Sequence, residues 1–216
     1  MQENVAFVNS LGRQLVGYWE PPQNRIGPFP AVVFAHDTGS SKDDPLDASI
    51  AKALLENGII PLRFDFTGHG SSEGSLDEAT PEQRSDDLLW AIDYALRRPE
   101  CTGAVGINGS GAGGLVGLMV ALTDFRLSAL VLRSPKANAL MQYTSLISAP
   151  TLVIAGSADP EAEACRELYE SLKVQKKLAV ITGTDGRFEN PADYEKMQNE
   201  TIDWFVQHLV PVEVTV

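Results

Sequence analysis

A glycine-rich segment near the middle of the chain, residues 105–114 (VGINGSGAGG), joins an apolar run to a helical pattern. Gly109 and Gly113 stand two residues before and two residues after position 111. Small residues at this spacing let a buried strand and the helix after it approach each other across a sharp turn. The segment therefore predicts a strand, a tight turn and a helix, with Gly111 at the point of the turn.

Position 111 is also where chemistry is expected. In the G-x-S-x-G form of this turn, the middle residue is a nucleophilic serine that is held exposed at the end of the strand. Here that residue is Gly111, which has no side chain. Ser110 fits the turn poorly, because Asn108 rather than a small residue stands two positions before it. We interpret Gly111 as a lost nucleophile and keep Ser110 as an alternative nucleophile.

The rest of the chain alternates between apolar runs and helical patterns. Two short runs at the N-terminus, 5–9 and 14–19, predict an antiparallel hairpin. Further strands are expected at 31–36, 59–64, 103–108, 128–132, 151–155 and 177–182, and helices at 50–57, 81–98, 112–122, 161–172 and 192–209. This order implies right-handed crossovers and a mostly parallel sheet with helices on both faces.

Length and composition favour one domain. A chain of 216 residues can bury the core of a single α/β domain over residues 1–216. The segment 134–149 is too short to form a folded lid, so we expect an open cleft above the sheet. The formal net charge of -12 argues against a nucleic-acid partner, because phosphate binding needs clustered lysine and arginine.

Cysteine usage and the N-terminus predict a cytoplasmic protein. Cys101 and Cys165 are far apart in the sequence and have neither a C-x-x-C nor a metal-ligand spacing. The N-terminus has no basic run followed by an apolar stretch, which a signal peptide would need. Residues 101–122 are uncharged over a length that could span a bilayer, but their glycine-rich middle indicates a buried strand, turn and helix. We therefore expect no membrane association.

Three further motifs carry a family resemblance. Residues 35–42 (AHDTGSSK) look like an H-G-x-G-S-S loop, and residues 63–74 (RFDFTGHGSSEG) look like an R-F-D-x-x-G-H-G-x-S-x-G turn. Residues 150–160 (PTLVIAGSADP) look like a strand and turn that deliver an acidic residue. With these motifs, the chain resembles the α/β-hydrolase superfamily over nearly its whole length, particularly small lidless esterases and dienelactone-hydrolase-like members. The resemblance implies the α/β-hydrolase fold.

The resemblance also implies a degenerate catalytic triad. It places Asp159 at the acid position, and it places the base in a G-x-x-H-x-F turn that residues 183–188 (GTDGRF) match. Gly186 stands where that turn has its histidine. His36 and His69 match loop positions of the family, and His208 is expected on the last helix near solvent. A serine is a poor nucleophile until a base takes its proton, so losing one removes the use of the other.

The oxyanion hole is expected to remain, because backbone N–H groups do not depend on the side chain. By resemblance these groups belong to Thr38 and Ala112, and the helix that begins at Ala112 would favour a small carboxylate or carbonyl there. Asp37 replaces a glycine of the family beside the hole, where its charge would oppose an anion. We expect Thr38, Ala112, Asp37 and His36 to make up the ligand-binding region.

Other arrangements of polar residues have simpler interpretations. His69 and Ser71 lie in a turn that is architectural in the family, so we do not expect a catalytic pair there. Asp37, Asp43, Asp44 and His36 match no recognised metal-ligand spacing. We expect neither a metal nor a cofactor.

These observations favour a pseudo-hydrolase that binds a small molecule or a protein through an open cleft, while its catalytic status stays open. The alternative is an active or weakly active carboxylic-ester hydrolase that uses Ser110, or a water held by Asp159. A further alternative is an engineered inactive variant of an esterase. Restoring Gly111→Ser together with Gly186→His is expected to return esterase activity if the motifs are aligned correctly. The oligomeric state and the ligand are left open.

Overall fold

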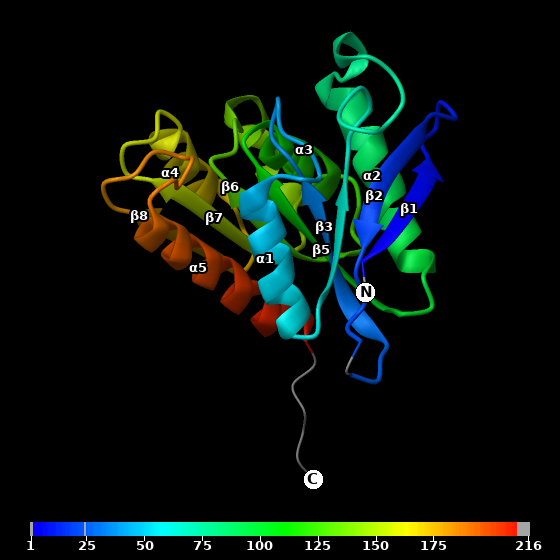
Figure 1. Cartoon of the computed structure of the whole chain (residues 1–216). Helices are drawn as coiled ribbons and strands as arrows, with labels where there is room; N and C mark the ends of the chain where they lie inside the picture. The colour runs from blue at the N-terminus through cyan, green and yellow to red at the C-terminus, as the bar shows by residue number, and fades with distance from the viewer. Residues whose placement is uncertain (1, 24, 211–216) are drawn as a thin grey trace.

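A computed structural model describes residues 2–23 and 25–210 of the chain, and this part forms one eight-stranded sheet in the order β1-β2-β4-β3-β5-β6-β7-β8 (Figure 1). The strands are β1 Glu3–Val8, β2 Gln14–Trp19, β3 Phe29–Ala35, β4 Ile60–Phe64, β5 Cys101–Ser110, β6 Leu127–Arg133, β7 Thr151–Gly156 and β8 Lys176–Ile181. The α-helices are α1 Pro45–Glu56, α2 Pro81–Arg97, α3 Ala112–Ala121, α4 Ala162–Ser171 and α5 Pro191–Leu209. Two 3-10 helices are η1 Leu76–Glu78 and η2 Asn138–Leu146.

The predicted N-terminal hairpin is confirmed. β1 pairs with β2 antiparallel, and β2 joins the main sheet antiparallel to β4. The turn is fixed by Asn9, whose side-chain oxygen accepts hydrogen bonds from the amides of Leu11 and Arg13, both at 3.0 Å. From β4 to β8 all neighbouring strands are parallel. The expected α/β-hydrolase architecture is therefore present.

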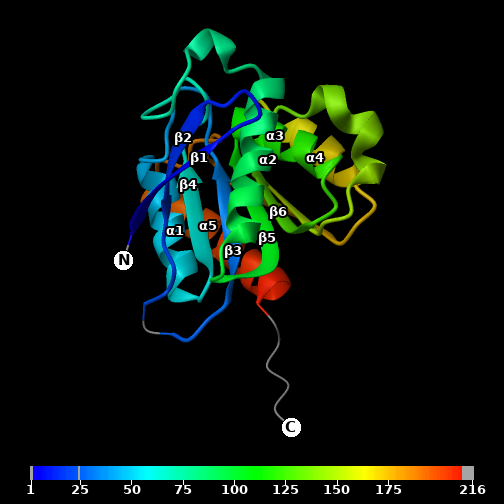
Figure 2. The same cartoon turned by 90° about the vertical axis from the view of Figure 1, so that its right-hand side faces the viewer.

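Helices cover both faces of the sheet. α1 and α5 lie against one face, and α2, α3 and α4 lie against the other (Figures 1 and 2). All five residues of β4 are buried, as are six of the seven in β3, which is why these strands read as continuous apolar runs rather than alternating ones. The carboxyl ends of the parallel strands and the loops that follow them meet at one edge of the sheet, and this edge carries the site.

Two local elements differ from the sequence-based expectation. α1 begins at Pro45 rather than at residue 50, because the Asp44 side chain caps the helix by accepting from the amides of Leu46 at 2.9 Å and Asp47 at 3.1 Å. The stretch expected to be irregular, 134–149, contains the 3-10 helix η2.

The segment from 101 to 122 folds as β5 and α3, as expected from its glycines. Over residues 2–23 and 25–210, none of the helices combines the length and the apolar composition that a membrane span requires.

Candidate active-site cleft

The strand-to-helix turn has the geometry that its glycines predict. β5 ends at Ser110, α3 begins at Ala112, and Gly111 between them has φ +53° and ψ -117°, a conformation that residues with a side chain rarely adopt. A Cβ at Gly113 would collide with the carbonyl oxygen of Ala35, and one at Gly109 would lie 2.8 Å from the carbonyl oxygen of Gly113. The small residues are therefore required by the close packing of α3 against β3 and β5.

The side chain of Asp37 fills the place where the resemblance puts the oxyanion hole. Its Oδ1 accepts hydrogen bonds from the backbone amides of Thr38 at 2.7 Å and of Ala112 at 2.8 Å. A Cβ at Gly111 would overlap the Asp37 carboxylate, so this carboxylate lies where a side chain of residue 111 would start. The helix N-terminus and the two charge-assisted bonds stabilise the carboxylate there. The expectation of a hole open to a ligand carboxylate or carbonyl is wrong, because the chain supplies its own anion.

Asp159 and Gly186 lie next to each other in one wall of the site. Asp159 lies in the turn after β7, where its Oδ1 accepts from the amide of Glu161 at 2.9 Å. A Cβ at Gly186 would collide with Asp159 Oδ2 and with Ser134 Oγ. The turn 183–188 is packed against the end of β7, since a Cβ at Gly156 would collide with the carbonyl oxygens of Thr184 and Asp185.

Backbone strain is concentrated around the same point. Among the described residues, Ser134 (φ +46°) and Phe188 (φ +53°) are the non-glycine residues in the left-handed region. Ser134 follows β6, Phe188 closes the turn that contains Gly186, and both are buried. Such strain persists where surrounding packing imposes it, and it is common at functional sites.

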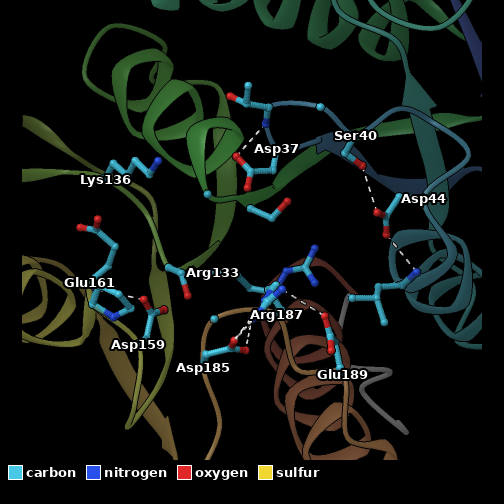
Figure 3. A pocket seen from close by; sticks show the side chains of 18 residues that line it. Asp37, Ser40, Asp44, Arg133, Lys136, Asp159, Glu161, Asp185, Arg187 and Glu189 are labelled. Carbon is cyan, nitrogen blue, oxygen red and sulfur yellow. Dashed lines mark hydrogen bonds and ion pairs between the residues drawn. The ribbon is translucent and has the colours of Figure 1, made fainter.

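A cleft of about 660 Å³ lies between these turns (Figure 3). The lining includes six residues that sequence analysis singled out: Asp37, Thr38, Ser110, Gly111, Asp159 and Gly186. In Figure 3, Lys136, Glu161 and Asp159 lie along one side and Ser40 and Asp44 lie along the other. The structure therefore brings together the positions that the resemblance assigned to nucleophile, base and acid.

His36 is not part of the cleft lining, which corrects the expectation that it binds a ligand. It is buried, its Nδ1 donates to the carbonyl oxygen of Asp37 at 2.8 Å, and its Nε2 accepts from the amide of Phe66 at 3.2 Å. Burial is the main cause that lowers the pKa of His36 from 6.5 to about 4. The neutral ring ties the loop before Asp37 to the loop after β4 and fixes the position of the carboxylate.

The other histidines also lie away from the cleft lining. His69 is buried, and its Nδ1 contacts the carbonyl oxygen of Thr67 at 3.0 Å. His208 lies on α5, as expected, where it is partly exposed and its ring is 4.2 Å from that of Trp204. In the described part of the chain, Ser110 Oγ makes no hydrogen bond to a base.

Several charged residues of the cleft were missed by sequence analysis: Arg133, Lys136, Glu161, Asp185, Arg187 and Glu189. They lie at or after the carboxyl ends of β6, β7 and β8. This position in the chain was the only feature of the sequence that could have indicated that they line the cleft. Asp44, which was considered only as a metal ligand, also lines the cleft. Arg133 forms a buried ion pair with Asp47, and Arg187 pairs with Asp185 at 3.0 Å and Glu189 at 3.5 Å. Within residues 2–23 and 25–210, no group of three or more metal-ligating side chains is placed to hold a metal ion.

The amino-acid sequence matches a known protein family. Residues 15–144, which are 130 of its 216 residues, match the X-Pro dipeptidyl-peptidase (S15) family. The chain belongs to the S15 family. The matched region includes Asp37 and the turn at Gly111, whereas Asp159 and Gly186 lie beyond it. The S15 assignment agrees with the α/β-hydrolase resemblance carried by residues 35–42 and 63–74.

Relatives of this S15-family chain include two Mycobacterium tuberculosis sequences that are provisionally named phosphoribosyl transferases. Each is 27% identical over 182 residues. The match covers 82% of this chain but only 41% of the relatives, so the chain spans about two fifths of their length.

Solved structures with the same fold cover nearly all of the chain. A dienelactone hydrolase from Anabaena variabilis has a TM-score of 0.82 at 24% identity and covers 96% of this chain and 99% of its own. Est1E from Butyrivibrio proteoclasticus, solved with ferulic acid bound, has a TM-score of 0.84 at 19% identity and covers 94% and 99%. The α/β-hydrolase GrgF from Penicillium has a TM-score of 0.86 at 18% identity and covers 98% and 100%. The predicted fold and family resemblance are confirmed.

Proposed function

We propose that this chain is a non-hydrolytic member of the esterase-like α/β-hydrolases that binds a small molecule in its open cleft. The observation that carries the proposal is the Asp37 carboxylate, which accepts from the amides of both Thr38 and Ala112. A volume of about 660 Å³ is in the range of small-molecule sites.

The chemistry of acyl transfer explains why this contact matters. A serine esterase needs a nucleophile, a base, and two donors that stabilise the negative charge on the substrate's carbonyl oxygen in the transition state. Asp37 already accepts from both donors, so a substrate oxyanion would have to displace it and would lie beside its charge. Loss of a single oxyanion-hole donor costs on the order of 10² to 10³ in rate. Gly111 and Gly186 supply neither nucleophile nor base.

The phosphoribosyl transferase name of the curated relatives has less support. A phosphorylated ribose donor would need several cationic or backbone donors, whereas six carboxylates and three cationic side chains line this cleft. Two of the three cations, Arg133 and Arg187, are engaged in ion pairs within the chain.

The first test is reactivity of the unaltered protein toward activated esters and a serine-directed fluorophosphonate. We expect no acyl-enzyme burst with p-nitrophenyl acetate and no covalent label detected by mass spectrometry. Weak steady-state turnover is compatible with the proposal, because an oxyanion hole and substrate binding without a triad can leave roughly 10³- to 10⁴-fold acceleration over water. With Asp37 in the hole we expect less than this. A label on Ser110 would contradict the proposal and establish the alternative nucleophile.

A constructive test restores the missing groups. The triple variant Asp37→Gly, Gly111→Ser, Gly186→His is expected to react with the fluorophosphonate at position 111, once the 183–188 turn shifts to admit a side chain. The double variant that keeps Asp37 is expected to stay inert, because a Cβ at 111 overlaps that carboxylate. Equal labelling of the double and triple variants would show that Asp37 does not block the site.

A further inference from the structure

Two carboxylates of the cleft, Asp37 and Asp159, have no salt-bridge partner among the described residues, although the buried guanidinium of Arg84 is close enough to interact electrostatically with Asp37. The Oδ1 atom of Asp37 is bonded to two amides, but its Oδ2 makes no hydrogen bond within the described part of the chain. The Asp159 carboxylate accepts one hydrogen bond, from the amide of Glu161 to Oδ1. Over residues 2–23 and 25–210, neither carboxylate takes part in an ion pair. In a complete triad, an imidazole would stand beside the acid, and here Gly186 leaves that place without a positive charge.

The other charged side chains of the cleft do not neutralise the carboxylates of Asp37 and Asp159. Arg133 is committed to Asp47, and Arg187 is committed to Asp185 and Glu189. Asp44 and Glu161 also line the cleft and have no ion-pair partner among the described residues. Lys136 is an exposed residue of the rim. The cleft therefore carries an excess of negative charge, which favours a cationic ligand.

Two buried polar atoms point to the same position. Asp159 is 8% exposed and Ser134 is 9% exposed, and in the described residues neither Asp159 Oδ2 nor Ser134 Oγ has a hydrogen-bond partner. Both atoms lie next to the place where a Cβ of residue 186 would stand. Buried polar groups are nearly always paired. Because a carboxylate oxygen only accepts, the partner that Asp159 lacks is a donor.

From this convergence we infer that the cleft takes an organic cation with N–H donors, a primary ammonium or an amidinium, that lies between Asp37 and Asp159 beside Gly186. The inference rests on the proposed binding function and names its ligand class. Anionic ligands are disfavoured at the same place, since Asp37 already holds the two backbone donors of Thr38 and Ala112. The N–H groups of the ligand supply the donor that Asp159 Oδ2 lacks, with a small shift of the 183–188 turn that covers this atom.

The experiment compares four small probes on the whole chain by calorimetry and by ¹⁵N-resolved amide shifts. Butylammonium and benzamidinium carry N–H donors and a positive charge, tetramethylammonium carries the charge without a donor, and butyrate carries the opposite charge. We expect the first two to bind with millimolar or tighter dissociation constants and to shift the amides of Thr38, Ala112 and Gly186. Tetramethylammonium is expected to bind at least about tenfold more weakly because it has no N–H donor. Butyrate is expected to bind at least about tenfold more weakly because the carboxylates of the cleft repel its charge.

Two variants and one control locate the site. Asp37→Asn and Asp159→Asn keep the side-chain shape and are each expected to weaken butylammonium binding by about tenfold or more. Asp77→Asn changes an exposed carboxylate outside the cleft and is expected to leave binding unchanged. Thermal melting of each variant checks that it is folded, and Asp159→Asn, which leaves the amide bonds of Asp37 intact, is the decisive variant if Asp37→Asn unfolds.

Several results would overturn the inference. These are butyrate or tetramethylammonium binding as tightly as butylammonium, no binding by either N–H cation, and wild-type affinity in a folded Asp159→Asn variant. Each of them leaves the fluorophosphonate result untouched, so failure of the ligand class is distinguishable from failure of the non-hydrolytic function.

Discussion

At the scale of single residues, the site is defined by the absence of a side chain at position 111 and the presence of a carboxylate at position 37. Gly111 has no side chain, and the Asp37 carboxylate occupies the space that a side chain would need. The same carboxylate satisfies the amides of Thr38 and Ala112, which in an esterase await the substrate. A glycine at position 111 and an acid at position 37 are thus mutually compatible, and adding a side chain at 111 while Asp37 is retained produces a collision.

This coupling predicts the stability of variants at position 111. Gly111→Ala is expected to lower the free energy of unfolding by about 2–4 kcal/mol, because it combines backbone strain with a collision against Asp37. In an Asp37→Gly background the same change is expected to cost only about 1–2 kcal/mol, since strain alone remains. Urea denaturation of the four proteins in this cycle measures the difference.

Gly103→Ala is the matched control for strain. Gly103 also has a positive φ, of +90°, but a Cβ there meets nothing within 4 Å. If Gly111→Ala costs the same with and without Asp37, the two residues are not coupled.

Burial of His36 predicts a dependence of stability on pH. In the folded protein the pKa of His36 is about 4, below the ordinary value of 6.5. Between these two pH values the unfolded chain therefore binds a proton at His36 that the folded protein does not bind. The stabilisation from the neutral ring is complete above pH 6.5 and is lost as the pH falls toward 4. The loss is on the order of 2–3 kcal/mol.

The measurement is urea denaturation at several pH values for the wild type and for His36→Gln, which retains a donor and an acceptor. We expect the wild type to lose more stability than the variant between pH 6.5 and 4. Parallel curves for the two proteins would mean that His36 does not carry this proton.

At the scale of secondary-structure elements, apolar patterning was a reliable guide to the strands but not to every helix start. β4 is wholly buried and β3 nearly so, so hydrophobicity alone marked them. The first turn of α1 (PLDA) begins with a proline and contains a buried aspartate, so it does not continue the apolar periodicity of the helix. Its start depends on the hydrogen bonds that Asp44 accepts as a cap. Capping geometry is a property of one side chain and its rotamer, which periodicity does not report.

The cap of α1 can be tested directly. Asp44→Ala is expected to lower the free energy of unfolding by about 1 kcal/mol, because two amides of the first turn lose their acceptor. Asp44→Ser keeps a capping oxygen and is expected to cost a smaller amount. Equal losses in the two variants, measured by thermal or urea denaturation, would contradict a role in capping.

At the scale of the whole molecule, the cleft is assembled from loops that are distant in sequence. Asp37 follows β3, Gly111 follows β5, Ser134 follows β6, Asp159 follows β7 and Gly186 follows β8. Parallel strands bring these ends to one edge of the sheet, where ligand sites of open α/β sheets form. The S15 match spans only the part from 15 to 144, so it covers the wall at Asp37 and Gly111 but not the wall at Asp159 and Gly186.

The sequence by itself determined the strand and helix order and the turn at Gly111, because apolar periodicity and glycine spacing are local properties of the chain. The assignment of Gly111 and Gly186 to nucleophile and base positions rests on the family resemblance and stays a prediction. Only the tertiary structure decided where the Asp37 carboxylate points, that His36 is buried and neutral, and that Ser134 and Asp159 converge on Gly186. Side-chain direction and charge balance depend on contacts between segments that are distant in sequence, such as the hydrogen bond from the amide of Ala112 to the Asp37 carboxylate, 75 residues away. No local pattern in the chain encodes those contacts.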